Sequence, residues 1–205
     1  MNFSKPFESM IPVVDSAVLT VLAESTKSRT GREVARAADR SQDATQRVLD
    51  RLVEHGVVLR EEAGRARVYR LNWDHVAAEP IVELASLRSR FFQRLQEEIA
   101  PWEPRPFHVS VFGSVARGEG DVDSDVDIFL VRPSAVEEDD AAWRGDVDAL
   151  ADQVYRWTGN HAGIAEVGQD ELDRLRREQP AILRSLRADA VDIVGAPLRS
   201  FLGRA

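Results

Sequence analysis

Residues 107–131 read FHVSVFGSVARGEGDVDSDVDIFLV, and this stretch decides how the C-terminal half of the chain folds. The apolar run 107–112 predicts a β-strand, and residues 113–117 can start a helix. A Gly-Ser pair at such a strand-to-helix turn lets the backbone approach a ligand closely. The free N–H groups at a helix start, together with the helix dipole, suit a phosphate. The turn at Gly113 and Ser114 is therefore a candidate phosphate cradle.

Two carboxylates stand at the start of the next apolar run, residues 125–131. Positions i and i+2 of a strand point to the same face, so Asp125 and Asp127 are expected to project together. Paired hard oxygen ligands beside a phosphate cradle indicate Mg²⁺, and two ions can hold a triphosphate. Asp-rich loops are more often solvated turns, and we interpret Asp121 and Asp123 in that way.

The same residues resemble a known signature. Gly-Ser, then Ala-Arg-Gly, then Ser-Asp-x-Asp running into an apolar strand is similar to the motif of the nucleotidyltransferase (DNA polymerase β-like) superfamily, in its minimal form. The resemblance implies that a nucleoside triphosphate donates its nucleoside monophosphate to a hydroxyl on RNA, protein or a small molecule. Gly113, Ser114 and Arg117 would bind the nucleotide, and Asp125 and Asp127 would be catalytic and hold two Mg²⁺.

The superfamily adds a third carboxylate from a neighbouring strand. The expected strand at 162–167 offers Glu166 and no Asp, so Glu166 is the candidate for a third catalytic residue. Glu166 shares a face with Ile164 under strand alternation, which does not mark it as a site residue. Without a third carboxylate, the domain would bind a nucleotide but transfer it poorly or not at all.

The N-terminal part predicts a different module. Apolar periodicity predicts helices over 12–25, 31–38 and 42–55, with Thr30 and Ser41 as N-caps. Two β-like runs, 57–60 and 66–71, follow. Three helices and a hairpin are typical of a winged helix-turn-helix, and residues 52–58 resemble the end of the recognition helix in MarR- and ArsR-like regulators.

That resemblance implies that the third helix enters the major groove of DNA. The expected DNA-binding residues are Gln42, Thr45, Gln46 and Arg47 on the helix, with Arg65 and Arg67 on the wing. Residues 1–75 carry 12 Lys/Arg and 11 Asp/Glu, which is weak for a DNA-binding surface. A solvated helix face, or a module that docks on another protein, is the alternative interpretation.

The predicted fold class is α+β. The expected domains are a winged helix-turn-helix domain at 1–75, one connecting helix at 76–100 and a nucleotidyltransferase domain at 101–205, with a mixed sheet and packed helices. Prolines at 101, 104 and 106 end the connecting helix. Its apolar stripe is typical of core packing, and it could also form a dimer seam.

The amino-acid composition excludes several classes of function. The chain has 205 residues, a net charge of −8 and no cysteine, which excludes disulfide and thiolate chemistry. Residues 76–205 hold the acidic excess, with 15 Lys/Arg and 24 Asp/Glu. No apolar run is long enough for a membrane span and no signal peptide is apparent, so a cytoplasmic location without membrane partners is expected.

Two functions from different classes remain open. The first is a Mg²⁺-dependent nucleotidyltransferase whose winged domain binds DNA or targets the enzyme. The resemblance to minimal nucleotidyltransferases then implies a toxin–antitoxin system with a HEPN-type partner protein. The second is a transcriptional regulator, which uses the nucleotidyltransferase domain to sense a nucleotide or bind a partner. A homodimer would make the DNA affinity useful.

Overall fold

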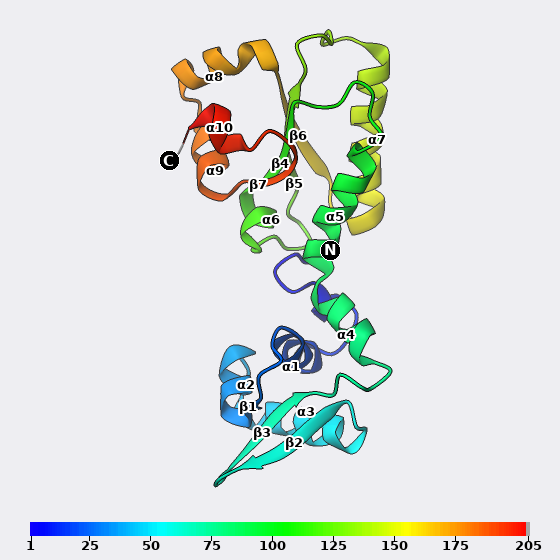
Figure 1. The fold of residues 1–205 in the computed structure, drawn as a ribbon, viewed down its shortest axis with the longest axis vertical. Helices are drawn as coiled ribbons and strands as arrows, with labels where there is room; N and C mark the ends of the chain where they lie inside the picture. The colour runs from blue at the N-terminus through cyan, green and yellow to red at the C-terminus, as the bar shows by residue number, and fades with distance from the viewer. Residues whose placement is uncertain (204–205) are drawn as a thin grey trace. The chain divides into compact units, whose positions relative to one another are not determined.

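The computed structural model describes residues 1–203, and within them the chain forms two compact units (Figure 1). One unit spans Lys5–Leu87. The other combines Met1–Ser4 with the chain from Arg88 onward. Among the described residues, no helix is both long and apolar enough to cross a membrane.

The unit Lys5–Leu87 has the helix and strand order of a winged helix-turn-helix. Its strands form an antiparallel sheet in the order β1-β3-β2. The wing is the β2–β3 hairpin, which turns at Gly64 in the left-handed region (φ +65°). The elements are η1 (Pro6–Ser9), α1 (Val13–Ala23), β1 (Arg29–Thr30), α2 (Gly31–Ala37), α3 (Gln42–Glu54), β2 (Val58–Ala63), β3 (Ala66–Leu71) and α4 (Ala78–Ala85).

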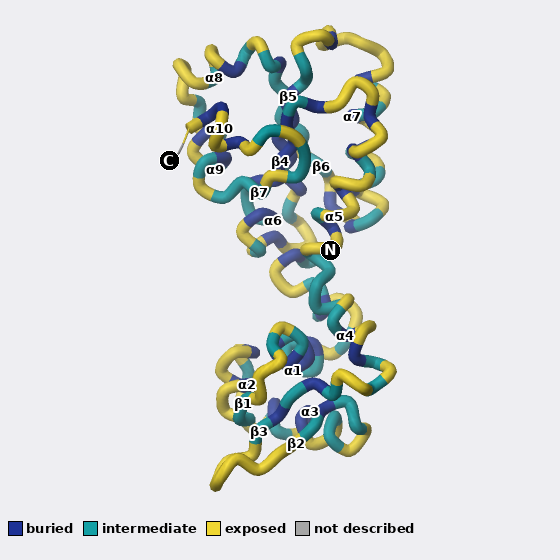
Figure 2. The backbone as a smooth tube through the Cα atoms, in the orientation of Figure 1, coloured by how far each residue is buried: buried dark blue, intermediate teal, exposed yellow. Residues whose placement is uncertain are grey.

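The helix starts of this unit follow from the sequence. Thr30 and Glu33 form the complete capping box that the sequence predicts, and Ser41 accepts a hydrogen bond from the Ala44 N–H. The inner faces of α1, α2 and α3 meet the strands in one core that contains Val18, Val34, Leu49, Tyr69 and Leu71 (Figure 2). Local capping and apolar periodicity therefore agree with the packing in this unit.

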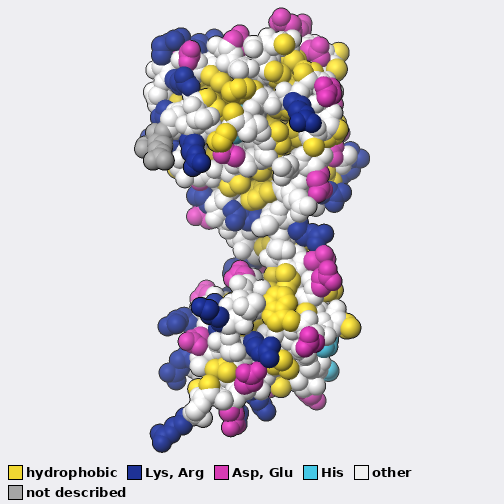
Figure 3. All heavy atoms as spheres, viewed as in Figure 1, with side chains coloured by type: hydrophobic (Ala, Val, Ile, Leu, Met, Phe, Trp, Pro, Cys, Tyr) yellow, Lys and Arg dark blue, Asp and Glu magenta, His cyan; other side chains and the backbone are white. Residues whose placement is uncertain are grey.

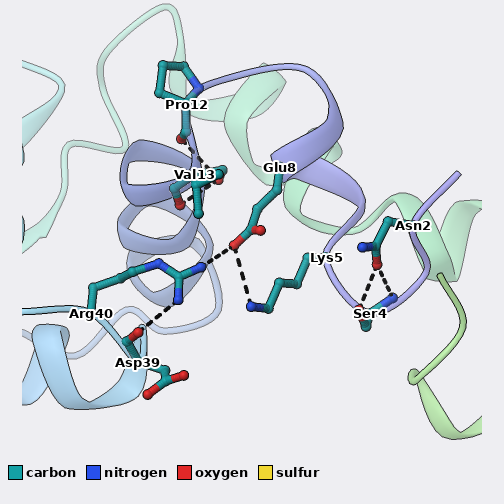
Figure 4. A network of polar contacts seen from close by, with 9 residues as sticks. Asn2, Ser4, Lys5, Glu8, Pro12, Val13, Asp39 and Arg40 are labelled. Atoms are coloured by element: carbon teal, nitrogen blue, oxygen red, sulfur yellow. Dashed lines mark hydrogen bonds and ion pairs between the residues drawn. The ribbon is translucent and has the colours of Figure 1, made fainter. Parts of the chain in front are cut away.

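A polar contact fixes the start of the unit. The Arg40 guanidinium, just after α2, donates to Glu8 of η1 at 2.6 Å, and Lys5 lies 3.8 Å from the same carboxylate oxygen (Figure 4). Phe7 from the same short helix is buried in the core beside α1. The segment before α1 is thus part of the folded unit.

The prediction of a single connecting helix over residues 76–100 is wrong, because the structure has two helices there. Helix α4 ends at Ala85, and α5 (Leu87–Ile99) starts after Ser86. The Ser86 hydroxyl donates to the Glu83 carbonyl, which competes with regular helical bonding. Helix α4 packs on α1, whereas Phe91, Leu95 and Ile99 of α5 lie in the core of the other unit.

The second unit is built on a four-stranded mixed sheet in the order β6-β5-β4-β7. Strands β5 and β6 are parallel, and the other pairs are antiparallel. After α5, the elements are β4 (His108–Phe112), α6 (Gly113–Arg117), β5 (Val126–Arg132), α7 (Ala141–Thr158), β6 (Ala162–Gly168), η2 (Gln169–Glu171), α8 (Leu172–Glu178), α9 (Ala181–Asp189), β7 (Val191–Gly195) and α10 (Leu198–Leu202). This architecture confirms the predicted α+β class.

Helices cover both faces of this sheet (Figures 1 and 2). The side chains of β5 pack against different helices on the two faces. Val126, Ile128 and Leu130 pack in a core with α5 and α7. Phe129 and Val131 point to the opposite face and pack with α8, α9 and α10. Alternation along β5 therefore assigns its odd-numbered residues to the α9 side of the sheet.

Candidate active site

The strand-to-helix turn after β4 requires glycine for two reasons. Gly113 has φ +72°, a backbone region that disfavours other residues. A Cβ atom at Gly113 would lie 2.4 Å from the Asp127 Oδ2 atom, so any side chain there would displace the Asp127 carboxylate. Strand pairing explains this proximity, because Phe112 and Asp127 are register partners in the β4–β5 ladder. The predicted cradle and the predicted carboxylate are thus direct neighbours.

The glycine-rich loop after α6 is held by backbone hydrogen bonds. Gly118 ends α6 with φ +75°, and the N–H groups of Glu119 and Gly120 both donate to the Ser114 carbonyl. The N–H of Ser4 donates to the Gly120 carbonyl at 3.0 Å. The loop that leads from the cradle to the Asp pair is therefore ordered by its own backbone and by the N-terminal segment.

The acidic part of the same loop is a built turn. The Asp121 carboxylate accepts hydrogen bonds from the Ser124 hydroxyl and the Asp123 N–H, and these bonds lower the pKa of Asp121. The buried Asn160 amide donates to the carbonyls of Asp121 and Ser124, at 3.0 and 2.8 Å. Asp121 therefore serves the turn, as the sequence indicates, and Asn160 is a supporting residue that the sequence did not reveal.

Asp125 and Asp127 lie at the start of β5, with Asp125 exposed and Asp127 half-buried. Burial raises the pKa of Asp127, the charges of Asp125 and Asp189 raise it further, and Arg117 partly offsets them. The two carboxylates are thus close enough to repel each other, and a bound cation would relieve that repulsion. The oxygen donors fit a hard divalent ion. Among residues 1–203, however, no three His, Cys, Asp or Glu side chains group as a metal site.

The structure does not bring Glu166 together with this pair. Glu166 of β6 accepts from Arg132 at 3.0 Å, from the Trp143 indole N–H at 3.0 Å and from Arg144 of α7. These partners lie on the α7 side of the sheet, whereas Asp127 faces the α9 side. Glu166 pairs with Leu130, three residues along β5 from Asp127, so alternation puts it on the other face.

Gly163 occupies the β6 position beside Asp127. The two residues are register partners, and a Cβ at Gly163 would lie 3.4 Å from the Asp127 Oδ1 atom. Strand β6 therefore brings no carboxylate to the site. The expectation that Glu166 supplies the third carboxylate is corrected by this register.

Asp189 is the acidic residue that sequence reasoning missed. It is the last residue of α9, and its side chain is 10% exposed. Its carboxylate accepts from the Gly113 N–H at 3.2 Å and from the Arg117 guanidinium. Arg117 also donates to Glu119 at 2.7 Å, and Glu119 and then Asp189 raise the pKa of Arg117. No local pattern could reveal Asp189, because α9 meets α6 only through tertiary packing.

The predicted DNA-binding residues separate into exposed and buried groups. Gln42 and Arg47 of α3 and both wing arginines are exposed. Thr45 is fully buried, so its predicted role is wrong: it lies three and four residues before the core residues Val48 and Leu49. Gln46 is partly buried and donates to Asp50 at 2.9 Å and to the Tyr69 hydroxyl at 3.0 Å.

The visible surface of the winged-helix unit carries mixed charge. Figure 3 shows a basic side chain projecting at the hairpin tip, with other Lys/Arg and Asp/Glu side chains interspersed over this face. Arg60 and Arg70 on the hairpin pair with Asp50 and Glu61. Acidic neighbours therefore offset part of the basic charge of the hairpin, and this face mixes both signs of charge.

The C-terminal unit, with its mixed sheet, its Gly-Ser turn and an Asp pair on the adjacent strand, has the architecture of a nucleotidyl-transferring domain. The family model for the nucleotidyltransferase domain matches residues 88–204, more than half of the chain. The chain belongs to the nucleotidyltransferase domain family. A family of unknown function (DUF7342) matches residues 15–110. No curated protein matches the chain.

Two solved structures are similar to part of the chain. One is a MarR family transcriptional regulator, SPO1453 from Silicibacter pomeroyi, at 25% identity over 43% of this chain and 65% of that one, with a TM-score of 0.34. The other is Lactococcus lactis ZitR in complex with DNA, at 18% identity over 43% and 62%, with a TM-score of 0.33. This chain covers less than two thirds of either. The winged-helix assignment rests on the element order described above.

Proposed function

We propose that the protein is a Mg²⁺-dependent nucleotidyltransferase that moves a nucleoside monophosphate from a nucleoside triphosphate to a hydroxyl acceptor. One observation carries the proposal. The Asp127 carboxylate lies directly against Gly113, so a metal-binding pair and a phosphate-binding turn share one small site. Membership of the nucleotidyltransferase family supports the same chemistry.

Each residue has a chemical role in this proposal. The Gly113 and Ser114 N–H groups and the Arg117 guanidinium bind the triphosphate, and Asp125 and Asp127 hold the divalent ions. Mg²⁺, when bound, neutralises the triphosphate and lowers the pKa of the acceptor hydroxyl. The acceptor oxygen forms a bond to the α-phosphorus, the bond to pyrophosphate breaks, and the hydroxyl proton passes to solvent. Positioning and charge neutralisation by the chain supply most of the rate.

Asp125 directly precedes β5 and Asp127 lies within it, whereas β6 brings no carboxylate to this pair. Gly163 leaves the β6 position beside Asp127 without a side chain. Binding of the nucleotide needs only the cradle and the Asp pair, whereas deprotonation of the acceptor gains from a further carboxylate. We therefore expect slow transfer, and this observation favours a second candidate function: a nucleotide-sensing module of a DNA-binding regulator.

The partners belong to the same proposal. DNA binding would use Arg65 and Arg67 of the exposed wing, with Gln42 and Arg47 of α3. A HEPN-type partner and a toxin–antitoxin role follow from the resemblance to minimal nucleotidyltransferases, and a homodimer would make the DNA affinity useful. The acceptor hydroxyl would then be on RNA or on the partner protein.

The test is transfer of label from each α-labelled nucleoside triphosphate, with Mg²⁺ and a lysate of the host as the source of acceptor. An Asp125→Asn/Asp127→Asn double variant runs in parallel. Label on RNA or protein with the wild type alone supports the enzyme. Metal-dependent nucleotide binding without transfer supports the sensor, and absence of both refutes the two functions.

A further inference from the structure

The predicted phosphate-binding groups already hold an anion that belongs to the chain itself. The Gly113 N–H and the Arg117 guanidinium are two of the three groups that we assign to the triphosphate, and both donate to the Asp189 carboxylate. Each Asp189 oxygen takes one of these donors. A carboxylate bound in this way resembles two oxygens of a phosphate in charge and acceptor geometry.

Asp189 comes from a separate layer of the fold. It ends α9, which packs on α6 from the same side of the sheet as Phe129 and Val131. Its side chain is 10% exposed, whereas that of its partner Arg117 is 43% exposed. Glu119, the other acidic partner of Arg117, is 64% exposed and has no bond to Gly113. The two acids therefore differ in kind, because only Asp189 reaches the cradle.

Asp189 adds a third carboxylate to the neighbourhood of the Asp pair. The charges of Asp189 and Asp125 both act on Asp127, and Arg117 offsets part of their effect. Like charges in one site favour the exchange of one anion for a ligand that brings its own cations. A metal–nucleotide complex is such a ligand.

We propose that Asp189 is a further residue of the nucleotide site and holds the place of a nucleotide phosphate, so that its carboxylate leaves Gly113 and Arg117 when a triphosphate binds. This inference rests on the proposed function, because it requires a triphosphate at the cradle. Asp189 then competes with the nucleotide phosphate for the Gly113 N–H and Arg117. Nucleotide affinity therefore depends on the stability of the packing of α9 on α6. An acid that ligated the metal would have the opposite effect on affinity.

The test compares dissociation constants by calorimetry with saturating Mg²⁺. The ligands are ATP and inorganic tripolyphosphate, which has no base. Asp189→Asn and Asp189→Ala are expected to bind both ligands about tenfold more tightly than the wild type, since about 1.4 kcal/mol of competition is removed. Glu119→Gln is the matched control, because it removes a carboxylate from Arg117 without freeing the Gly113 N–H, and it should change affinity by less than about twofold. Thermal unfolding verifies that each variant is folded.

The possible results distinguish failure of the competing role of Asp189 from failure of the proposed function. Unchanged or weaker binding by both Asp189 variants, with wild-type binding intact, overturns the competing role and leaves the proposed function standing. An equal gain in Glu119→Gln also overturns it, because the effect would then be general charge. If neither ligand binds the wild type or any folded variant in Mg²⁺, the proposed function fails and this inference fails with it.

Discussion

Gly163 of β6 is the register partner of Asp127 of β5, and it places a hydrogen where a side chain would face the Asp127 carboxylate. A Cβ built at Gly163 lies 3.4 Å from the Asp127 Oδ1 atom, and the backbone there is not in the left-handed region. A side chain can therefore be introduced without backbone strain. This position decides how many carboxylates the sheet can offer to a metal.

Gly163→Asp is expected to strengthen divalent-ion binding. A third carboxylate beside Asp127 adds ligand charge, so Mg²⁺ affinity should rise about tenfold, while stability without metal should fall through added repulsion. Calorimetric titration with Mg²⁺ measures the first effect, and thermal unfolding in EDTA measures the second. Gly163→Asn has nearly the same shape and no charge. If Asn has the same effect as Asp, ligand charge is not the cause.

Asp127→Asn is expected to stabilise the metal-free protein at neutral pH. The raised pKa of Asp127 means that the folded state binds its proton more tightly than the unfolded state does, so stability falls as pH rises through that pKa. Asparagine carries no charge at any pH, so the variant does not undergo this loss of stability. Its melting temperature in EDTA should exceed that of the wild type at pH 7, and the gap should narrow as pH drops toward about 4. A constant gap would show that the ionisation of Asp127 is not responsible.

Glu166→Gln is expected to lower stability and leave nucleotide binding unchanged. Glu166 neutralises Arg132 and Arg144 and accepts from Trp143, so the amide leaves two arginines without their anion. The free energy of unfolding should fall by about 1–3 kcal/mol in chemical denaturation. Glu171→Gln, which loses one exposed pair with Arg174, should cost less than about 1 kcal/mol. Loss of transfer by a folded Glu166→Gln protein would restore Glu166 as a catalytic candidate.

Thr45→Val is expected to stabilise the winged-helix unit and leave DNA binding unaltered. Thr45 is buried, and its hydroxyl has no hydrogen-bond partner among the described residues, so the hydrophobic replacement should add about 1 kcal/mol. Arg65→Gln/Arg67→Gln should weaken binding to host DNA fragments, with a shallower salt dependence. Gel shifts at two stated salt concentrations measure the DNA affinity of both variants, and thermal unfolding measures the stability of Thr45→Val. A loss of DNA affinity in Thr45→Val with no change at the wing would reverse this assignment.

The local parts of the fold and site could be predicted because their causes are local. Thr30 and Glu33 form the capping box that their spacing predicts. Strand alternation brings Asp127 against the Gly-Ser turn, since β4 and β5 are antiparallel neighbours along the chain. The mixed sheet and the winged-helix order follow from the same periodicities.

The other parts depend on tertiary packing. Asp189 is 76 residues from Gly113, and only the docking of α9 on α6 joins them. Thr45 lies on the inner face of α3 with Val48 and Leu49. The helical spacing of three and four residues from Thr45 to these apolar residues could have predicted its burial from the sequence. The helix break at Ser86 separates α4, which packs in one core, from α5, which packs in the other. The apolar residues of both helices recur with the same helical period, so the sequence pattern does not show the break.

Transfer of a nucleoside monophosphate by the Asp pair and the Gly113 turn can be tested in one labelling experiment. The most direct measurement compares α-labelled and γ-labelled forms of one nucleoside triphosphate, with Mg²⁺, the protein and its host lysate. Our expectation is that α-label becomes acid-precipitable with the wild type, that γ-label does not, and that the Asp125→Asn/Asp127→Asn variant transfers neither. Transfer of γ-label, or equal α-label with the double variant, would contradict it.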